Sequence, residues 1–528
     1  MNKLLLLGDE ALAQGAIDAG VSGAYGYPCT PSTEIILYFQ KNQEAIEKNI
    51  HRKWSCNEKT ALESALGMSY AGKRTLATMK HVGLNVAADA YINSALTGSN
   101  GGLLVAVADD PSMHSSQGEQ DSRFYAKFSF LPVLEPSNQQ EAYDMAFYGF
   151  EFSEKYELPV MIRLVTRLSH SRAGIERRKT LPENQLNIAK PDMRFILLPA
   201  IARKRYNLLL EKQESLVTAS ENSPYNVYTD GKDKSMGIIA CGLAYNYLME
   251  SISGTNLDHP ILKICQYPLP RKQIERLFNE CQSVLVLEEG QPIVEEQLRG
   301  YLNNHKPIKG RLNGTIPRAG ELNPNIVSQA LGNKEDTTYS VPEIIVQRPP
   351  ALCNGCSHID LYHALNEIVT KYGKGHVFSD IGCYTLGALP PYNTIDTCVD
   401  MGAAITMAKG AADAGLYPSI AVIGDSTFTH SGITGLLDCV NENTNMVVII
   451  ADNETTAMTG GQESSGLGKL ESICEGLGVD KNHIRVCTPL KKNHDEVVNI
   501  LHEEIEYQGL SVIIPRRECI QTLKRKNK

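Results

Sequence analysis

The 528-residue sequence lacks any run of 18 consecutive apolar residues, so we predict no transmembrane helix. Its start, MNKLLLLGDE, has too short an apolar run for the hydrophobic region of a signal peptide. It also lacks an excess of basic residues, because 51 Lys and Arg are outnumbered by 60 Asp and Glu, which leaves a net charge of −9. A general nucleic-acid binder needs a clustered basic face. We therefore expect a cytoplasmic protein that binds neither membranes nor nucleic acids.

Long polar tracts and a regular cysteine framework are also missing. The thirteen cysteines are odd in number and scattered, so we expect reduced thiols, metal ligands or buried side chains rather than a set of disulfides. Apolar residues make up 42% and charged residues 21%, which are ordinary values for a globular protein and exclude disorder. The length predicts about three or four domains.

Short apolar runs alternate with helical stretches along the chain. This alternation is typical of parallel sheets covered by helices on both faces, so we predict an α/β fold with doubly wound sheets. Two irregular stretches, 186–234 and 334–349, are expected to be linkers, and they separate three domains at 1–185, 235–333 and 350–528. The runs that we expect to form strands are 102–108, 159–164, 237–240, 283–287, 420–423 and 446–451.

The third domain contains a pattern of polar residues after two of these strands. Gly424, Asp425 and Ser426 follow one strand, and Asn453 follows the next. Parallel strands present their carboxyl ends at one sheet edge, where ligands bind. Asp and Asn oxygens suit Mg²⁺ together with phosphate oxygens, and a glycine lets the backbone approach a pyrophosphate. The pattern predicts a thiamine pyrophosphate (TPP) and Mg²⁺ motif; the alternative is a strand-end turn in which the Asp caps a helix.

Cysteines in the same domain form a second pattern. Cys353 and Cys356 make a C-x-x-C pair, which is compatible with zinc, a redox dithiol or an iron–sulfur cluster, or with a buried pair at a helix start. Cys383 follows in a glycine-flanked loop after the expected strand 376–379. A fourth thiolate is available from Cys519, Cys487 or Cys474.

The first domain carries three polar segments. Thr30 and Ser32 offer hydroxyls at the start of an expected helix, which suits a carboxylate but also simple helix capping. Glu58 opens the expected helix 60–71, where it complements the helix dipole; in a TPP enzyme, one buried Glu hydrogen-bonds N1′ of the aminopyrimidine. The polar loop 108–123 follows a strand and indicates either a site or an exposed turn.

Together these segments resemble the α subunits of indolepyruvate:ferredoxin oxidoreductase, within the TPP-dependent 2-oxoacid:ferredoxin oxidoreductase superfamily. The resemblance covers nearly the whole chain. The motifs that carry it are YPCTPSTE (27–34), WSCNEKTALE (54–63), TMKHVGLNVAAD (78–89), ADDPSMHSSQGEQDSR (108–123), RPPALCNGCSH (348–358), DIGCYTLGALP (380–390), MGAAI (401–405), GDSTFTHSGITGL (424–436) and DNETTAMTGGQ (452–462).

The resemblance implies a pyrimidine-binding TPP domain at 1–185, a transketolase C-terminal-like domain at 235–333 and a pyrophosphate-binding TPP domain at 350–528. The two TPP domains would share one cofactor. The implied reaction is oxidative decarboxylation of an arylpyruvate, such as indole-3-pyruvate, with CoA to acyl-CoA and CO₂. Electrons would pass through an iron–sulfur cluster to ferredoxin, and a small β subunit would complete a hetero-oligomer.

The resemblance also assigns residues to the cofactor. Asp425, Asn453 and the Thr455 carbonyl would bind Mg²⁺, and Gly424 and Ser426 would contact the pyrophosphate.

For the reacting end, the resemblance makes Glu58 the activator of the aminopyrimidine and Thr30 the hydroxyl that meets the 2-oxoacid carboxylate. His114, Ser115 and Gln117 would line this end, with His114 catalytic.

Met458 would help to accept an aromatic side chain, because methionine is apolar and adaptable. The resemblance implies one [4Fe–4S] cluster on Cys353, Cys356, Cys383 and Cys519, with Cys519 chosen because it follows the last expected strand, 510–514.

Two departures from the family pattern bear on these expectations. The usual ferredoxin-like run, C-x2-C-x2-C-x3-C-P, does not occur, so we expect distal clusters on a partner or electron transfer directly from the proximal cluster. Cys29 stands where the family usually has glycine, with consequences for specificity or oxygen sensitivity. Two other functions stay open: a non-oxidative 2-oxoacid decarboxylase, which has no need of the cysteines, and a non-catalytic assembly subunit, which Glu58, Asp425 and Asn453 disfavour.

Overall fold

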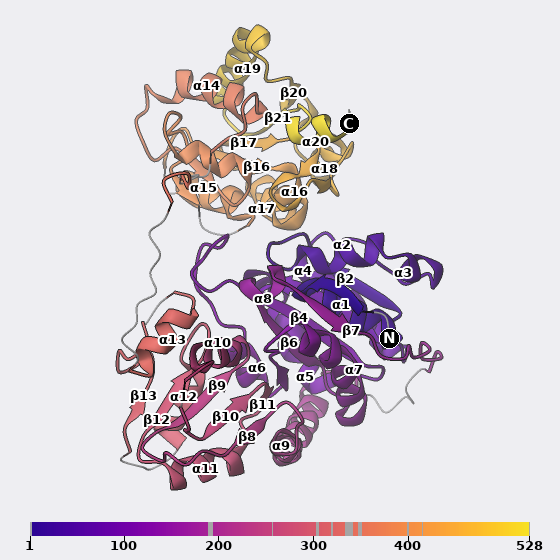
Figure 1. Ribbon diagram of the computed structural model, residues 1–528. Helices are drawn as coiled ribbons and strands as arrows, with labels where there is room; N and C mark the ends of the chain where they lie inside the picture. The colour runs from indigo at the N-terminus through magenta and orange to yellow at the C-terminus, as the bar shows by residue number, and fades with distance from the viewer. Residues whose placement is uncertain are drawn as a thin grey trace. The chain divides into compact units, whose positions relative to one another are not determined.

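The computed structural model divides into two compact units, Met1–Tyr339 (unit 1) and Ser340–Lys528 (unit 2). It describes residues 3–187, 194–255, 257–301, 306–317, 320–332, 342–346, 351–398, 401–413 and 415–526. Each unit is described by itself (Figure 1). Of the expected linker 334–349, only residues 342–346 are described.

Unit 1 contains the first predicted domain, built on a six-stranded sheet with the strand order β11-β5-β6-β4-β3-β2. All pairs in it are parallel except β11 with β5. The central strands are buried along their whole length, which explains their apolar sequences. The strands are β2 (Gly23–Gly26), β3 (Thr75–Lys80), β4 (Leu103–Asp109), β5 (Val133–Leu134), β6 (Val160–Val165) and β11 (Gln266–Tyr267).

Helices connect these strands, and an antiparallel pair of short strands, β1 (Lys3–Leu7) and β7 (Arg172–Glu176), lies outside the sheet. The helices are α1 (Gly8–Asp18), α2 (Thr33–Lys41), α3 (Gln43–Glu47), α4 (Glu58–Tyr70), α5 (His81–Thr97), α6 (Arg123–Ser129), α7 (Gln139–Tyr156) and α8 (Thr166–His170).

The predicted middle domain belongs to the same unit. Its five-stranded sheet has the order β13-β12-β9-β10-β8. The middle domain contributes strand β11 to the first sheet, where β11 pairs with β5, and this pairing helps to join the two domains. Its elements are β8 (Val227–Thr229), β9 (Gly237–Cys241), α10 (Leu243–Ile252), β10 (Ile261–Ile264), α11 (Arg271–Glu280), β12 (Val284–Leu287), α12 (Ile293–Tyr301), β13 (Ile308–Lys309) and α13 (Pro324–Ala330).

The structure differs from the expected linker at 186–234. Helix α9 (Pro199–Glu221) occupies most of this stretch, and β8 pairs antiparallel with β10 in the middle sheet. Only Leu209, Leu216 and Ser220 of α9 are buried, so the helix shows too narrow an apolar stripe for its periodicity to be recognised in the sequence.

Unit 2 contains a six-stranded parallel sheet in the order β15-β14-β16-β17-β21-β20. Apolar cores lie on both faces of this sheet, as in doubly wound folds. Its strands are β14 (Val377–Ser379), β15 (Thr397–Cys398), β16 (Ile420–Gly424), β17 (Met446–Ala451), β20 (Ile484–Cys487) and β21 (Leu510–Pro515), and a two-stranded ladder pairs β18 (Thr455–Thr456) with β19 (Gln462–Glu463).

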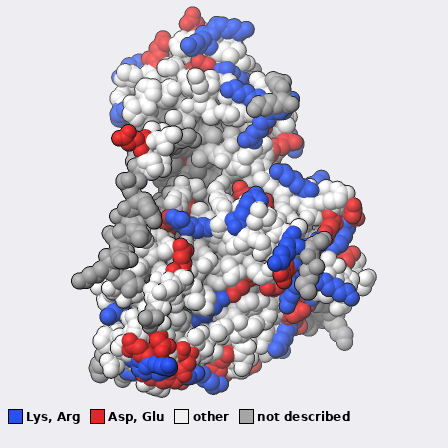
Figure 2. All heavy atoms as spheres, viewed as in Figure 1, with Lys and Arg blue, Asp and Glu red and all other residues white. Residues whose placement is uncertain are grey.

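The helices of unit 2 connect these strands. They are α14 (Ser357–Val369), α15 (Ala403–Asp413), α16 (Asp425–Thr427), α17 (Ile433–Glu442), α18 (Leu470–Leu477), α19 (His494–Glu506) and α20 (Ile520–Lys526). Within the described ranges, no helix combines the length and apolar composition that a membrane crossing needs. On the face shown in Figure 2, Lys and Arg side chains are interspersed with Asp and Glu.

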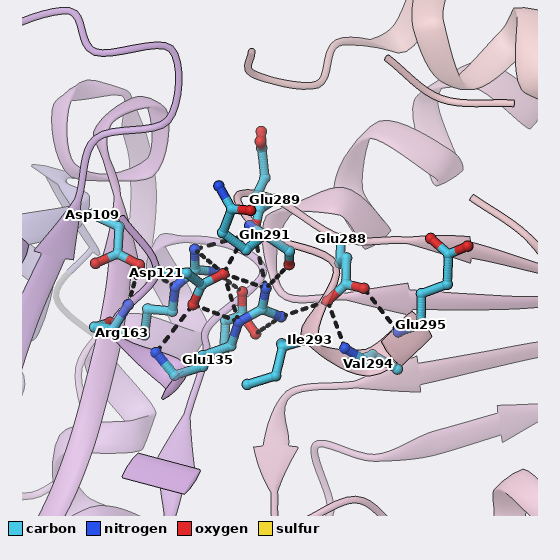
Figure 3. A network of polar contacts seen from close by, with 12 residues as sticks. Asp109, Asp121, Glu135, Arg163, Glu288, Glu289, Gln291, Ile293, Val294 and Glu295 are labelled. Carbon is cyan, nitrogen blue, oxygen red and sulfur yellow. Dashed lines mark hydrogen bonds and ion pairs between the residues drawn. The ribbon is translucent and has the colours of Figure 1, made fainter. Parts of the chain in front are cut away.

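A buried ion network joins the two domains of unit 1 (Figure 3). Arg163 binds Asp109 (Nε–Oδ2 2.6 Å) and Glu135, and its side chain is fully buried. Arg123 binds Asp121 (Nη2–Oδ2 2.6 Å) from the same domain and Glu288 (Nη1–Oε2 3.1 Å) from the middle domain. Breaking such a buried pair typically costs about 3–5 kcal/mol, because one charge is left unpaired.

Backbone carbonyls of the middle domain complete the network. Both arginines donate to the carbonyl of Glu289 (3.0 and 3.1 Å), and Arg123 also donates to that of Gln291 (3.0 Å). The turn fits only because Gly290 (φ +83°) has no side chain, since a Cβ there would lie 2.8 Å from Asp121 Oδ2. The network therefore specifies one arrangement of the two domains within the unit.

Glu288 and Glu289 make the stability of unit 1 depend on pH. Burial raises the pKa of each carboxyl from 4.5 to about 7. Between these values the folded state holds protons that the unfolded state releases, so the free energy of unfolding falls as pH rises from about 4.5 to 7. We expect Glu288→Gln/Glu289→Gln to flatten this dependence.

Denaturant unfolding followed by fluorescence of Trp54, the single tryptophan, would report on unit 1 specifically. Glu275→Gln, which changes an exposed glutamate of α11, is the control and keeps the wild-type slope. An unchanged slope in the double variant would contradict this assignment.

Candidate functional site

Thr30 and Ser115, two predicted residues of unit 1, lie together near the carboxyl ends of β3 and β4. Lys80 ends β3 and Asp110 follows β4, and their side chains are almost completely buried, with Nζ 3.7 Å from Oδ2. Lys80 Nζ also donates to the carbonyl oxygen (2.8 Å) and Oγ (3.1 Å) of Ser115. Ser115 Oγ in turn lies 3.2 Å from the carbonyl oxygen of Thr30. The structure thus brings together Thr30 and Ser115, two of the predicted substrate residues.

Asp110 anchors the polar loop that follows β4. Its Oδ2 accepts from the N–H of Ser115 (2.8 Å) and from Ser116 Oγ, and its Oδ1 accepts from Thr166 Oγ1 (2.7 Å). Burial alone would raise the pKa of Asp110, but these hydrogen bonds and Lys80 outweigh it and lower the pKa to about 2. The carboxylate is therefore ionised at any physiological pH.

Glu58 begins helix α4 and is buried. The cap residue Asn57 accepts from the N–H of Thr60 (2.8 Å), which fixes the start of the helix. A Cβ at Gly83 of α5 would lie only 2.5 Å from Glu58 Oε1, so the glycine makes room for the carboxyl group.

The thiol of Cys29 lies among these groups. Burial raises its pKa to about 12, Lys80 opposes this rise, and Glu58 and Asp110 add to it. These mutual effects place the four side chains in one neighbourhood. At neutral pH the Cys29 thiol is therefore protonated and is a weak nucleophile.

Two other predicted residues point elsewhere. His114 Nε2 lies 3.1 Å from Glu321 Oε2 of the middle domain, and Glu321 also binds Arg167 (Nε–Oε2 2.8 Å). Gln117 is exposed. The roles of His114 and Gln117 at the reacting end stay predictions.

Lys80 and Asp110 were not among the predicted site residues. A lysine in the otherwise apolar or small-residue strand 75–80 was the available signal, since lysine is almost never fully buried unless it is paired.

In unit 2, the predicted pyrophosphate loop follows β16. Strand β16 pairs with β17 so that Gly424 lies opposite Ala451, which brings the segments after both strands to one edge of the sheet. A Cβ at Gly424 would lie 2.5 Å from Cε1 of Tyr384, so only glycine fits here. Ser426 Oγ lies 2.8 Å from Thr456 Oγ1, a contact that ties the loop to the segment after β17.

Asp425 carries a buried oxygen atom that has no hydrogen-bond partner among the described residues. This atom is Oδ2, and the side chain that carries it is 3% exposed. Burial, reinforced by Asp452, raises its pKa to about 7. Leaving such a group unpaired costs free energy, which a bound cation would offset. This orphaned oxygen fits the predicted Mg²⁺ site.

The other predicted ligands follow β17. Asn453 is buried, and its Oδ1 accepts from the N–H of Thr455 (3.2 Å). Thr455 Oγ1 donates to the carbonyl of Gln462 (2.8 Å), which holds the segment between β18 and β19. Met458 lies in this segment with its side chain 61% exposed. An oxygen-rich strand end beside a constrained loop is a suitable place for a hard cation and its phosphate.

Cys519 lies next to this edge. Its N–H donates to the carbonyl of Asn453 (3.0 Å), and Gln521 of α20 contacts Cys353 Sγ (3.3 Å). Burial raises the pKa of Cys383 to about 12, and Cys356, Cys519 and Cys353 add to that rise. The four predicted cluster ligands therefore share one electrostatic neighbourhood.

The four thiols influence one another electrostatically, but they do not form a metal-binding site in the described residues. Throughout the described ranges, no three His, Cys, Asp or Glu side chains converge as a metal ion requires. Four thiols are nonetheless the donor set that an iron–sulfur cluster takes. Cys487 and Cys474, the other candidates for the fourth ligand, are buried in the two apolar cores of unit 2.

Known proteins match the chain on both sides of the middle domain. Residues 14–194 match the family described as "Pyruvate flavodoxin/ferredoxin oxidoreductase, thiamine diP-bdg". Residues 380–514 match the family described as "Thiamine pyrophosphate enzyme, C-terminal TPP binding domain". These matches confirm the predicted fold class and the two TPP-binding domains.

Relatives match over almost the whole chain. "Indolepyruvate oxidoreductase subunit IorA" of Archaeoglobus fulgidus is 39% identical over 98% of this chain and 86% of the relative. The protein of the same name from Methanothermobacter thermautotrophicus is 36% identical over 98% and 87%. The solved 2-oxoglutarate:ferredoxin oxidoreductase from Magnetococcus marinus covers 62% of this chain and 65% of its own, with a TM-score of 0.52 and 18% identity, which shows a shared fold.

Asp425→Asn tests the predicted cation site. Removing the charge would lower the affinity for TPP with Mg²⁺ by about 100-fold, equivalent to about 3 kcal/mol for a lost charged contact. The stability of the cofactor-free protein would stay equal or rise, because a neutral amide replaces a buried carboxyl group that lies near Asp452. Calorimetric titration and thermal unfolding would measure the two effects. Asp438→Asn, at an exposed position of α17, is the control, and unchanged affinity in Asp425→Asn would exclude the carboxylate as a ligand.

Proposed function

The chain belongs to the family of indolepyruvate oxidoreductase α subunits, and from this membership we propose that it catalyses the TPP-dependent oxidative decarboxylation of an arylpyruvate with CoA. Indole-3-pyruvate is the proposed type of substrate. The products are an acyl-CoA, CO₂ and two electrons, which pass through one [4Fe–4S] cluster to ferredoxin. A small β subunit completes the hetero-oligomer. The observation that carries the proposal is the buried Asp425 Oδ2, which has no hydrogen-bond partner among the described residues and belongs to the unit that also holds four thiols within electrostatic range of one another.

The residues of unit 2 suit the phosphate end of TPP. Asp425, Asn453 and the Thr455 carbonyl would hold Mg²⁺, and Gly424 and Ser426 would contact the pyrophosphate. When bound, TPP supplies the electron sink that decarboxylation of a 2-oxoacid needs. Asp425 Oδ2 supports this assignment, because it has no hydrogen-bond partner in the described structure.

Glu58 suits the other end of the cofactor. Its carboxyl group is buried at the start of α4, away from bulk water, and would hold and return a proton at N1′ of the aminopyrimidine. Thr30 would meet the substrate carboxylate, with Ser115 holding the Thr30 segment. His114 and Gln117 would line this end.

Met458 is the proposed contact for the aromatic side chain of the substrate. Its side chain is exposed and conformationally adaptable, so it can pack on an aromatic ring.

Cys353, Cys356, Cys383 and Cys519 are the proposed ligands of the cluster. A thiolate-held cluster accepts single electrons, which an oxidative reaction needs and a simple decarboxylase does not. Without iron, burial keeps Cys383 protonated, so cluster assembly must release protons. The non-oxidative decarboxylase is thus the second candidate, and it leaves this group of thiols without a use. A non-catalytic subunit would have no need of Glu58 or of the unsatisfied Asp425.

Glu58→Ala tests the catalytic part of the proposal. We expect turnover to be abolished, because the carboxyl group proposed to hold the proton at N1′ is removed. The loss of stability should be about 1 kcal/mol or less, the value of one acidic residue in the first turn of a helix. The measurement is anaerobic formation of acyl-CoA and reduced viologen from an arylpyruvate, CoA and TPP, with the partner subunit present.

Glu63→Ala changes an exposed glutamate of the same helix and serves as the control. Full activity in Glu58→Ala would remove this residue from the mechanism. Formation of an aldehyde without viologen reduction by the wild type would instead favour the decarboxylase.

A further inference from the structure

The burial of Lys80 costs free energy. Lys80 ends a strand whose six residues are all buried, and its own side chain is 3% exposed. Burial lowers its pKa, while Cys29 and Asp110 act in the opposite direction. Burying an ammonium group costs several kcal/mol unless its partners compensate. A role beyond packing would explain why the strand ends with a charge.

The contacts of Lys80 orient a hydroxyl group. An ammonium group only donates, so Ser115 Oγ accepts from Lys80. The hydroxyl hydrogen of Ser115 must then point away from Lys80, and its acceptors are the Thr30 carbonyl (3.2 Å) and Asp110 Oδ2 (3.3 Å). Lys80 also binds the Ser115 carbonyl, so both the main chain and the side chain of Ser115 are fixed.

Asp110 holds the same loop from the other side. It accepts from the N–H of Ser115 and from the hydroxyl of Ser116, and Thr166 fixes its second oxygen. The pair is close to neutral in sum, since the carboxylate offsets the ammonium. Its effect on the site is therefore mechanical rather than electrostatic.

Hydrogen bonds hold the peptide groups on both sides of Thr30. Ser32 donates to the Cys29 carbonyl through its N–H (2.9 Å) and its Oγ (2.8 Å), and Ser115 Oγ lies within hydrogen-bond distance of the Thr30 carbonyl (3.2 Å). With both carbonyls fixed, the Cα–Cβ direction of Thr30 is also fixed. A hydroxyl that must meet a substrate carboxylate benefits from such preorganisation.

We propose that the buried Lys80–Asp110 pair positions Thr30 for the 2-oxoacid carboxylate, acting through Ser115. Lys80 is a positioning residue and does not contact the substrate. The inference rests on the proposed function, because it takes Thr30 as the group that meets the carboxylate. It predicts that the pair controls 2-oxoacid binding and leaves the affinity for TPP unchanged.

The test compares variants in the full chain loaded with TPP and Mg²⁺. Lys80→Met removes the charge at similar length. Ser115→Ala removes the hydroxyl that joins Lys80 and Asp110 to Thr30 and keeps the charged pair and the contact of Lys80 with the Ser115 carbonyl. Binding of phenylpyruvate is followed by the fluorescence of Trp54, which forms a β-bridge with Gly26 close to the Thr30 segment. The affinity for TPP is measured separately by calorimetry.

We expect Lys80→Met to weaken phenylpyruvate binding by about 10- to 100-fold, the range for a misplaced binding group. Ser115→Ala should act in the same direction and more weakly, and it keeps the test valid if Lys80→Met does not fold. Affinity for TPP should change less than twofold in both. Lys59→Met, at an exposed position of α4, is the matched control and should bind like the wild type.

A double-mutant cycle with Thr30→Val separates positioning from direct contact. If Lys80 acts through Thr30, then Lys80→Met should add little once the hydroxyl is gone. Full additivity, or an unchanged phenylpyruvate affinity in both Lys80→Met and Ser115→Ala, would overturn the inference. Failure of the wild type to bind any 2-oxoacid would instead count against the proposed function.

Discussion

The buried ion network of Arg123 and Arg163 is the interaction on which the geometry of unit 1 depends. Asp109, which binds Arg163, immediately precedes Asp110 at the start of the polar loop 108–123. Asp121 and Arg123, which bind each other, lie at the end of the same loop. The network thus fixes both ends of the loop that carries Ser115. Because it also binds carbonyls of the middle domain, it explains why the predicted first and middle domains form one unit.

In unit 2, the two predicted sites also share contacts. Cys519 donates its N–H to the carbonyl of Asn453, so a proposed cluster ligand and a proposed Mg²⁺ ligand share one hydrogen bond. Tyr384, the neighbour of Cys383, packs against Gly424 so closely that a side chain there would overlap it. A site that takes electrons from a substrate benefits when the acceptor is held by the frame that holds the cofactor.

Much of the fold followed from local patterns, whereas most tertiary contacts did not. The buried strands β4, β6, β9, β12, β16 and β17 were predictable because each is a short apolar run between helices. Helix α9 was missed because its buried stripe is narrow, and the pairing of β11 with β5 leaves no local signal.

The candidate site divides in the same way. Gly424, Asp425 and Asn453 could be proposed from the sequence because their types and spacing suit the chemistry, and their roles stay predictions. The role of Lys80 depends on partners 30 and 35 positions along the chain, at Asp110 and Ser115, and single-sequence reasoning has no means to pair them. The contact of His114 with Glu321 spans two domains and was equally hidden.

The central claim, that four thiols make this TPP protein an oxidoreductase, is tested most directly by iron and acid-labile sulfide per chain. The protein would be purified anaerobically, alone and with its partner subunit, next to Cys519→Ser and Cys487→Ser. We predict about four of each per chain for the wild type and for Cys487→Ser, and a clear loss for Cys519→Ser. Neither iron nor sulfide in the wild type, with TPP still bound, would contradict the claim and favour the non-oxidative decarboxylase.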